Sequence, residues 1–294
     1  MLFRSESEVI IVPDSCMYQV PFSALREEGG KYFSEMARIR IVPSLTTLKI
    51  IQESPPEYHS QVGALIVGDP EVGEVIYNGR RRTIEPLPCA RNEAEMIGRL
   101  LGVTPLTAHH ATKEAVLQAI NSVSLIHLAA HGDAERGEIL LSPKRPTPFI
   151  PREEAYLLTM ADISQIKLRA KLVVLSCCHS GRGEIKVEGV IGVARAFLAS
   201  GARSVLVTLW AIEDKATEQF MNRFYRHLVD GFSASECLHQ AMKWLRNIGY
   251  TKVSQWAPFM LIGDNVTFNF KEERLVIFPS NTTSISPPTE GGSS

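Results

Sequence analysis

Residues 172–183 read LVVLSCCHSGRG, an apolar run that meets two adjacent cysteines and then turns polar and glycine-rich. Such a run, ended by turn-forming residues, is typical of a buried strand in a parallel sheet. Ligands collect beyond the carboxyl ends of strands in these sheets, so chemistry is expected near the cysteines. Alternation places Val173, Leu175 and Cys177 on one face, which leaves Cys178 as the first residue free to point into the following loop.

The rest of the chain alternates short apolar runs with helical patterns, which is the signature of strand-helix units around a parallel sheet. The predicted strands are 9–12, 39–42, 64–68, 125–130, 172–176, 205–209 and 259–263. The predicted helices are 45–53, 91–102, 112–121, 189–200, 213–230 and 233–248. Thr112 and Ser233 are predicted N-caps. The sequence therefore predicts an α/β fold with a mostly parallel central sheet.

Some stretches are predicted to lie outside this core. Residues 70–90 are polar and turn-rich, which indicates a long loop or a boundary between two halves. The last residues are poor in apolar side chains and are expected to be disordered. The predicted division is one domain over 1–278, with an N-terminal half over about 1–88, a catalytic half over about 89–264 and an extension over 265–278, followed by a disordered tail over 279–294.

Composition argues against several classes of partner and location. The 294 residues include 31 basic and 32 acidic side chains, and the net charge of -1 provides no field that favours nucleic acid or an anionic membrane. Five cysteines are an odd number and too few for a disulfide framework in a chain this long. A reducing compartment is therefore expected: the cytoplasm, with the nucleus or the cytoskeleton as alternatives.

Targeting segments, membrane spans and nucleotide sites are not predicted either. Arg4, Glu6 and Glu8 occupy positions where a signal peptide would be apolar. The longest apolar region, residues 189–210, is interrupted by charges and by a Ser-Gly pair, so it predicts a helix and a strand rather than a membrane span. The sequence has no glycine-rich phosphate loop, and no cofactor is expected.

A second strand end is expected to bring a histidine close to the cysteines. In LIHLAAHGD, residues 125–133, His127 falls in mid-strand and His131 at the exit. A nearby histidine can deprotonate a thiol and then protonate a leaving amine, so His131 and Cys178 form a candidate Cys-His dyad for acyl transfer. They are 47 residues apart (178 minus 131), close to the separation of about 50 residues in caspases. The backbone amides of Gly132 and Cys178 are the candidate oxyanion donors.

These strand ends belong to a larger set of ordered motifs. The set comprises IIVPDSCMYQVPFSAL, PSLTTL, GDP, ATKEAVL, HLAAHGD, LVVLSCCHSGRG, GVARAFLASGARSVLVTLWAIEDKAT, FYRHLVDG and WAPFMLIGD. Over about residues 8–264 the chain thus resembles the CHAT domain, a caspase- and separase-like family commonly attached to tetratricopeptide repeats. The resemblance implies a caspase-like three-layer sandwich and a cysteine endopeptidase that acts on a protein or peptide. It also implies tetratricopeptide repeats in the same or a partner chain, so the sequence is expected to be part of a longer repeat protein.

The resemblance also implies roles for individual residues. The strand of the family ends in Leu-Ser-Ala-Cys, which aligns Cys178 with the nucleophile and Cys177 with the alanine. His179 stands where many members carry an acidic residue, and that acid bears on recognition of a basic residue before the scissile bond. The candidate substrate pocket therefore consists of Asp133, His179, Glu213 and Asp214.

Other interpretations stay open. The fold can serve as a catalytically silent interaction or regulatory module of a repeat scaffold, or as a non-proteolytic hydrolase or acyltransferase with the same dyad. His127 and His131 form H-x-x-x-H, but this spacing on a strand does not suit joint ligation, so no metal site is predicted. His127 is instead expected to be a core histidine. His109, His110 and residues 80–82 are expected in solvated loops.

Overall fold

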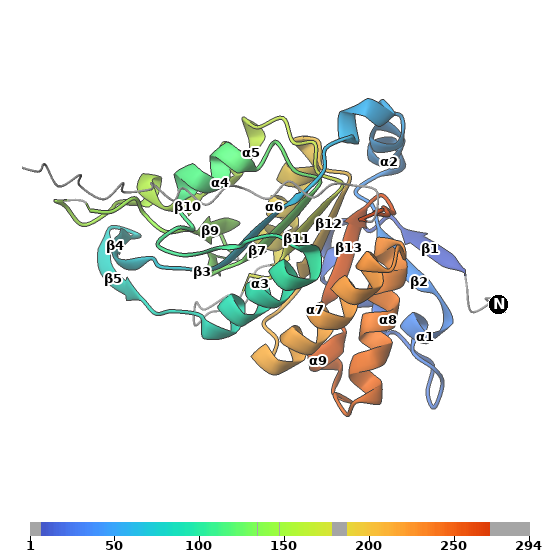
Figure 1. Cartoon of the computed structure of the whole chain (residues 1–294). Coiled ribbons are helices and arrows are strands. Elements are labelled where there is room, and N and C mark those ends of the chain that lie inside the picture. Colours follow the sequence, from blue (N-terminus) through green and yellow to red (C-terminus); the bar gives the residue numbers. More distant parts are fainter. Residues whose placement is uncertain (1–6, 134, 147, 178–186, 271–294) are drawn as a thin grey trace, which may run out of the picture.

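The computed structural model describes residues 7–133, 135–146, 148–177 and 187–270 (Figure 1). Cys178, His179 and the predicted tail over 279–294 lie outside these residues. The described chain is built around an eight-stranded sheet with the order β1-β2-β13-β12-β11-β7-β3-β6. Adjacent strands in it are parallel except β12 and β13, so the predicted α/β class with a mostly parallel sheet is confirmed.

Seven of these strands were predicted. They are β1 (Glu8–Ile11), β2 (Arg38–Ile41), β3 (Ala64–Pro70), β7 (Leu125–Ala129), β11 (Leu172–Leu175), β12 (Ser204–Thr208) and β13 (Phe259–Gly263). The edge strand β6 (Leu106–Ala108) was missed, because a three-residue strand is too short to show alternation.

The predicted helices are also confirmed. They are α2 (Leu45–Gln52), α3 (Pro88–Leu101), α4 (Lys113–Ala119), α6 (Val187–Ala199), α7 (Asp214–Val229) and α8 (Ala234–Asn247). Thr112 and Ser233 cap α4 and α8 as expected, because their side chains accept hydrogen bonds from Ala115 N–H and Glu236 N–H. Short helices not predicted are α1 (Phe33–Met36), α5 (Met160–Ser164) and α9 (Val253–Trp256).

Helices cover both faces of the sheet, and strand alternation decides which side chains meet which layer. Val173 and Leu175 of β11 join a cluster that includes Phe197 of α6, whereas Leu172 and Val174 join a cluster with residues of α3, α7 and α8. Figure 1 shows these last three helices together on one side of the sheet. The chain is therefore a three-layer sandwich with an apolar core on each face.

The long loop predicted over residues 70–90 is wrong. The segment forms an antiparallel hairpin of β4 (Gly73–Tyr77) and β5 (Arg80–Ile84). Asn78 and Gly79 make its two-residue turn, with φ of 50° and 69°. An Asn-Gly pair is a strong hairpin signal. The arginines at 80–82 are exposed as expected, but they lie in β5, and this strand was missed because its sequence does not alternate between apolar and polar residues.

The hairpin packs against a second, smaller sheet near the end of β7. This sheet has the order β10-β9-β8, with β8 (Gly132–Asp133), β9 (Glu138–Leu140) and β10 (Leu157–Leu158). Val75 of the hairpin shares a buried cluster with Leu140, Tyr156 and Leu157. As a result, the hairpin and the small sheet lie beside the residues that follow β7.

Candidate functional site

The catalytic candidates follow two adjacent parallel strands. β7 and β11 pair in register, with Leu128 opposite Leu175, so both strands deliver their next residues to the same edge of the sheet. His131 lies two residues beyond β7, and Cys177 lies two residues beyond β11. Cys177 is half-buried, and its thiol lies 3.7 Å from the carbonyl oxygen of Leu128. It packs on the same core as Val173 and Leu175, as strand alternation predicted.

The imidazole of His131 is oriented by a backbone carbonyl. Its Nε2 atom lies 2.7 Å from the carbonyl oxygen of Glu85, and the residue is only 6% exposed. Because a carbonyl oxygen only accepts hydrogen bonds, Nε2 must carry the hydrogen in this contact. In the neutral ring the basic lone pair is then on Nδ1, which is the atom that can accept a proton.

Sequence reasoning missed the role of Glu85. The residue lies just after β5, in the short connection to α3, and it acts through its backbone rather than its side chain. A main-chain carbonyl leaves no signature in residue type. The adjacent Pro86 is the only local hint, because a residue before proline is restricted to extended conformations.

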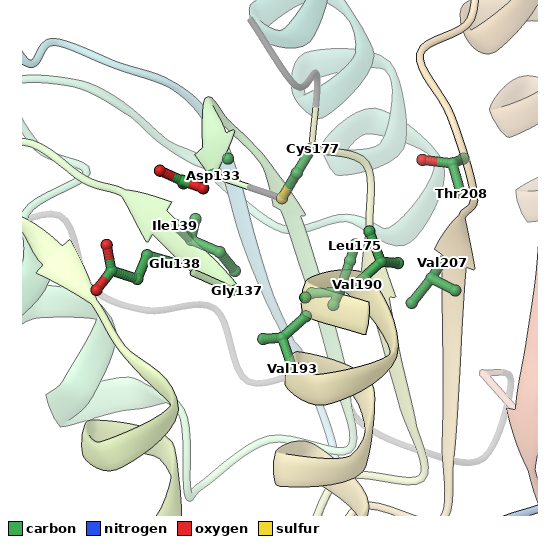
Figure 2. A pocket seen from close by; sticks show the side chains of 12 residues that line it. Asp133, Gly137, Glu138, Ile139, Leu175, Cys177, Val190, Val193, Val207 and Thr208 are labelled. Carbon is green, nitrogen blue, oxygen red and sulfur yellow. The ribbon is translucent and has the colours of Figure 1, made fainter. Parts of the chain in front are cut away.

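A pocket opens beside this edge of the sheet. Figure 2 shows Asp133 and Glu138 on one side of it and Val207 with Thr208 on the other. Between these two sides the pocket is mostly apolar. The full lining is Gly132, Asp133, Gly137, Glu138, Ile139, Leu175, Cys177, Gly189, Val190, Val193, Val207 and Thr208.

The Asp133 carboxylate is surrounded by hydrogen-bond donors. It accepts from the Tyr77 hydroxyl and from the backbone N–H groups of Glu135 and Arg136, the latter two at 2.8 and 3.0 Å. Burial alone would raise the pKa of Asp133, but these hydrogen bonds outweigh burial and lower it. The carboxylate is therefore held in its ionised form.

At Glu138, in contrast, burial outweighs the interactions that favour the ionised carboxylate. It is 7% exposed, and one of its oxygens lies 2.9 Å from Arg136 Nη2. Its other oxygen, Oε2, accepts no hydrogen bond from any group in the described ranges. Burial raises the pKa of Glu138, Arg136 opposes the shift, and the nearby charges of Asp133 and Glu153 add to it. Neither residue type nor motif order singles out Glu138, because its burial depends on the small sheet.

The remaining candidates are spread over different surroundings. Gly132 lines the pocket together with Asp133. Glu213 precedes α7, with a carboxylate oxygen 3.5 Å from Gln255 Nε2, and Asp214 interacts with the Cys89 thiol. Neither lines the pocket, so the structure does not bring them together with Asp133.

His127 is a core histidine, as predicted. The residue is fully buried, its Nδ1 is hydrogen-bonded to the Tyr225 hydroxyl at 3.0 Å, and its Nε2 lies 3.0 Å from Glu93 Oε1. Among the residues whose positions are described, no group of three or more His, Cys, Asp or Glu side chains could hold a metal ion. Over the same part of the chain, none of the helices combines the length and apolarity that crossing a membrane requires.

Comparison with known sequences agrees with the motif analysis. A family model described as the CHAT domain matches residues 3–264. The chain is 31% identical to tetratricopeptide repeat protein 28 of Homo sapiens and 30% identical to that of Mus musculus. Each comparison covers 89% of this chain but 12% of the relative, so the chain spans about an eighth of the length of these proteins.

Solved structures show the same fold at low sequence identity. Separase in the Saccharomyces cerevisiae separase-securin complex is 15% identical, with a TM-score of 0.53 over 88% of this chain and 16% of separase. Gingipain R, an Arg-specific cysteine proteinase, is 12% identical, with a TM-score of 0.50 over 80% of this chain and 56% of that one. These similarities confirm the caspase-like three-layer sandwich.

Proposed function

Because the chain belongs to the CHAT domain family, we propose that it is a cysteine endopeptidase domain of a longer tetratricopeptide repeat protein, with His131 and Cys178 as its catalytic dyad. The observation that carries this proposal is the Glu85 contact, which fixes the tautomer of His131 beside the strand that leads to the cysteines. A general base at a strand end needs its proton-accepting nitrogen defined in this way.

In the proposed reaction, His131 Nδ1 accepts the proton of the Cys178 thiol. The thiolate attacks the peptide carbonyl carbon, and the backbone amides of Gly132 and Cys178 stabilise the resulting oxyanion. His131 then donates the proton to the leaving amine as the carbon-nitrogen bond breaks. Water activated by the same imidazole hydrolyses the thioester, releases the carboxylic acid and restores the thiol.

The lining of the pocket favours a substrate with a basic residue before the cut. Asp133 and Glu138 provide negative charge on one side, and Glu138 Oε2 offers an acceptor that no described donor uses. Apolar side chains such as Leu175 and Val190 would contact the aliphatic stem of lysine or arginine. His179 would then be less important for this preference than the two carboxylates.

The first experiment is pH-dependent alkylation of the purified domain with trace reagent, read by mass spectrometry at each cysteine. We expect Cys178 to label selectively, with a half-maximal rate below about pH 8.5, because the histidine stabilises the thiolate. His131→Ala should abolish this selectivity, and Cys177→Ala, the matched neighbour, should retain it. Peptides with Arg, Lys or Gln before the cut would then be tested, with a loss of cleavage of about 10²-fold or more expected in His131→Ala.

The same experiment can reject the proposal. If Cys178 labels no faster than the exposed Cys16, with or without His131, the dyad is not assembled. The domain would then be a silent interaction module, and its partners would be sought with Cys178→Ala, which should bind them as well as the wild type.

A further inference from the structure

Asp69 connects the end of β3 to the segment that orients His131. It follows Gly68 in β3 and is 3% exposed. Its Oδ1 accepts a hydrogen bond from Leu87 N–H at 2.6 Å, and its Oδ2 lies 3.0 Å from Arg91 Nε and 2.7 Å from Arg91 Nη2. Both oxygens of this buried carboxylate therefore bind the residues that enter α3.

The segment held by Asp69 has little freedom of its own. It reads Glu85-Pro86-Leu87-Pro88, and because proline has no N–H, Leu87 has the only backbone donor between Glu85 and Cys89. Pro86 restricts Glu85 to extended conformations. Fixing the Leu87 N–H therefore fixes the direction of the Glu85 carbonyl two residues earlier.

We propose that Asp69 is a positioning residue for His131, which acts by holding Leu87 and through it the Glu85 carbonyl that binds His131 Nε2. The two hydrogen bonds of this relay are 2.6 and 2.7 Å long. Strand pairing supports it, because Gly68 lies opposite Ala129, so Asp69 lies near the end of β3 at the level where the chain leaves β7 toward His131. The inference rests on the proposed function, in which Nδ1 of His131 is the base.

The test substitutes Asp69 and observes His131 directly. Asp69 has a φ of 48°, a left-handed conformation that glycine adopts without strain, so Asp69→Gly removes the carboxylate and leaves the backbone relaxed. Asp69→Asn is the conservative variant, because its amide oxygen can still accept from Leu87. Imidazole nitrogen resonances of histidine-labelled protein report the tautomer, and Cys178 alkylation reports the dyad.

Under conditions in which the imidazole is neutral, we expect the wild type to show the Nε2–H tautomer of His131 alone. Asp69→Gly should show a mixture of both tautomers and a Cys178 labelling rate at least tenfold lower, since a displacement of about 1 Å can cost about 10²-fold in rate. Asp69→Asn should keep the wild-type tautomer and at least half of the rate.

Asp264→Asn is the control for general destabilisation. Asp264 is another buried carboxylate, 5% exposed, which pairs with Arg203 and accepts from Gln52 Nε2 at 3.1 Å. It follows β13, which runs antiparallel to β12, and so lies at the opposite end of the sheet from His131. This variant should lose stability but keep the wild-type tautomer and labelling rate.

A second variant keeps the inference testable if Asp69→Gly does not fold. Pro86→Gly changes an exposed residue, leaves Asp69 and its partners in place and frees the Glu85 carbonyl, so it should also mix the tautomers. A wild-type tautomer in the folded variants overturns the inference, and so does an equal change in Asp264→Asn. If Cys178 labelling is independent of His131 in the wild type, the proposed function fails, while the tautomer measurement still decides the role of Asp69.

Discussion

At the level of single residues, the pocket places two carboxylates under opposite constraints. Asp133 is half-buried among donors that outweigh its desolvation, whereas Glu138 is buried with one arginine, which also pairs with Glu153 at 3.0 Å. Asp133 therefore stays charged at low pH, and Glu138 takes up a proton at a higher pH than an exposed glutamate would. A bound cation would lower the free-energy cost of keeping the buried Glu138 carboxylate ionised.

Glu138→Gln tests that cost. Since the pKa of Glu138 is raised in the folded state, its ionised form destabilises the fold above that pKa, and the effect disappears as the pH falls toward the unfolded value of about 4.3. We expect the variant to be more stable than the wild type at neutral pH and equal to it near pH 4, as measured by urea unfolding. Cleavage before arginine should fall relative to cleavage before glutamine.

Glu74→Gln is the control for this measurement. The hydrogen bond from Arg81 lowers the pKa of Glu74, so this substitution should give no stabilisation at neutral pH. A Glu138→Gln variant that is less stable than the wild type at neutral pH would show that its pair with Arg136 outweighs its burial.

At the level of elements, the position of α3 depends on one close approach to β3. A Cβ atom built at Gly68 would lie 2.3 Å from Ala94 Cβ and 2.8 Å from the carbonyl oxygen of Ala90. The helix therefore packs directly on the strand backbone, which only glycine permits. α3 begins three residues after Glu85. The close contact at Gly68 and the hydrogen bonds of Asp69 therefore together determine how far the segment of Glu85 lies from the sheet.

Gly68→Ala should separate α3 from the sheet. We expect a loss of about 1–3 kcal/mol in the free energy of unfolding, since the added carbon meets backbone and a short side chain that cannot move aside. Cys178 labelling should slow in the same variant because the Glu85 segment shifts with the helix. Urea unfolding and alkylation at neutral pH measure the two effects.

Gly192→Ala provides the comparison within a helix. Its Cβ would meet only the flexible end of Met160, at 3.2 Å from Sδ, and alanine is favoured over glycine inside a helix by about 0.5–1 kcal/mol. This variant should be neutral or stabilising. Equal stability of Gly68→Ala and the wild type would mean that α3 can move without cost.

At the level of the whole molecule, the sheet combines strands from both ends of the chain. β1 and β2 extend it through β13, and Arg40 ties this edge together. Arg40 is 3% exposed, donates to the Gly263 carbonyl at 2.8 Å and lies 2.9 Å from Glu8 Oε2 and 3.7 Å from Asp264 Oδ1. The N-terminal strands are thus part of the central sheet, and their loss would expose the edge of β13.

Arg40→Met should destabilise the domain by about 3 kcal/mol, because the Gly263 carbonyl loses its donor and both Glu8 and Asp264 lose a buried cationic neighbour. Hydrogen exchange should accelerate in β1, β2 and β13 together. Lys49→Met is the matched control, since Lys49 forms an exposed pair with Glu53 at 3.7 Å and its loss should cost less than about 1 kcal/mol. Unchanged exchange in β13 would contradict the view that these strands unfold as one unit.

Most of the secondary structure could be predicted because its signals are local. The strands around Val173 and His127 are continuous apolar runs, and the helices carry both periodicity and caps. The hairpin was missed although Asn78 and Gly79 form a known turn signal, because neighbouring arginines suggested a solvated loop. Glu213 and Asp214 were predicted as pocket residues from motif order alone, and they do not line the pocket that Asp133 lines.

The sequence by itself determined the α/β class, the strand that leads to the cysteines, His131 at the end of its neighbour and the membership of a family. These follow from patterns within one element or one motif. Only the tertiary structure decided how His131 is oriented, because its contact with the Glu85 carbonyl joins residues 46 apart in the chain, and the contact of Asp69 with Leu87 joins residues 18 apart. It also decided the charge balance at Glu138, since burial and neighbouring charges depend on how separate elements pack rather than on residue type.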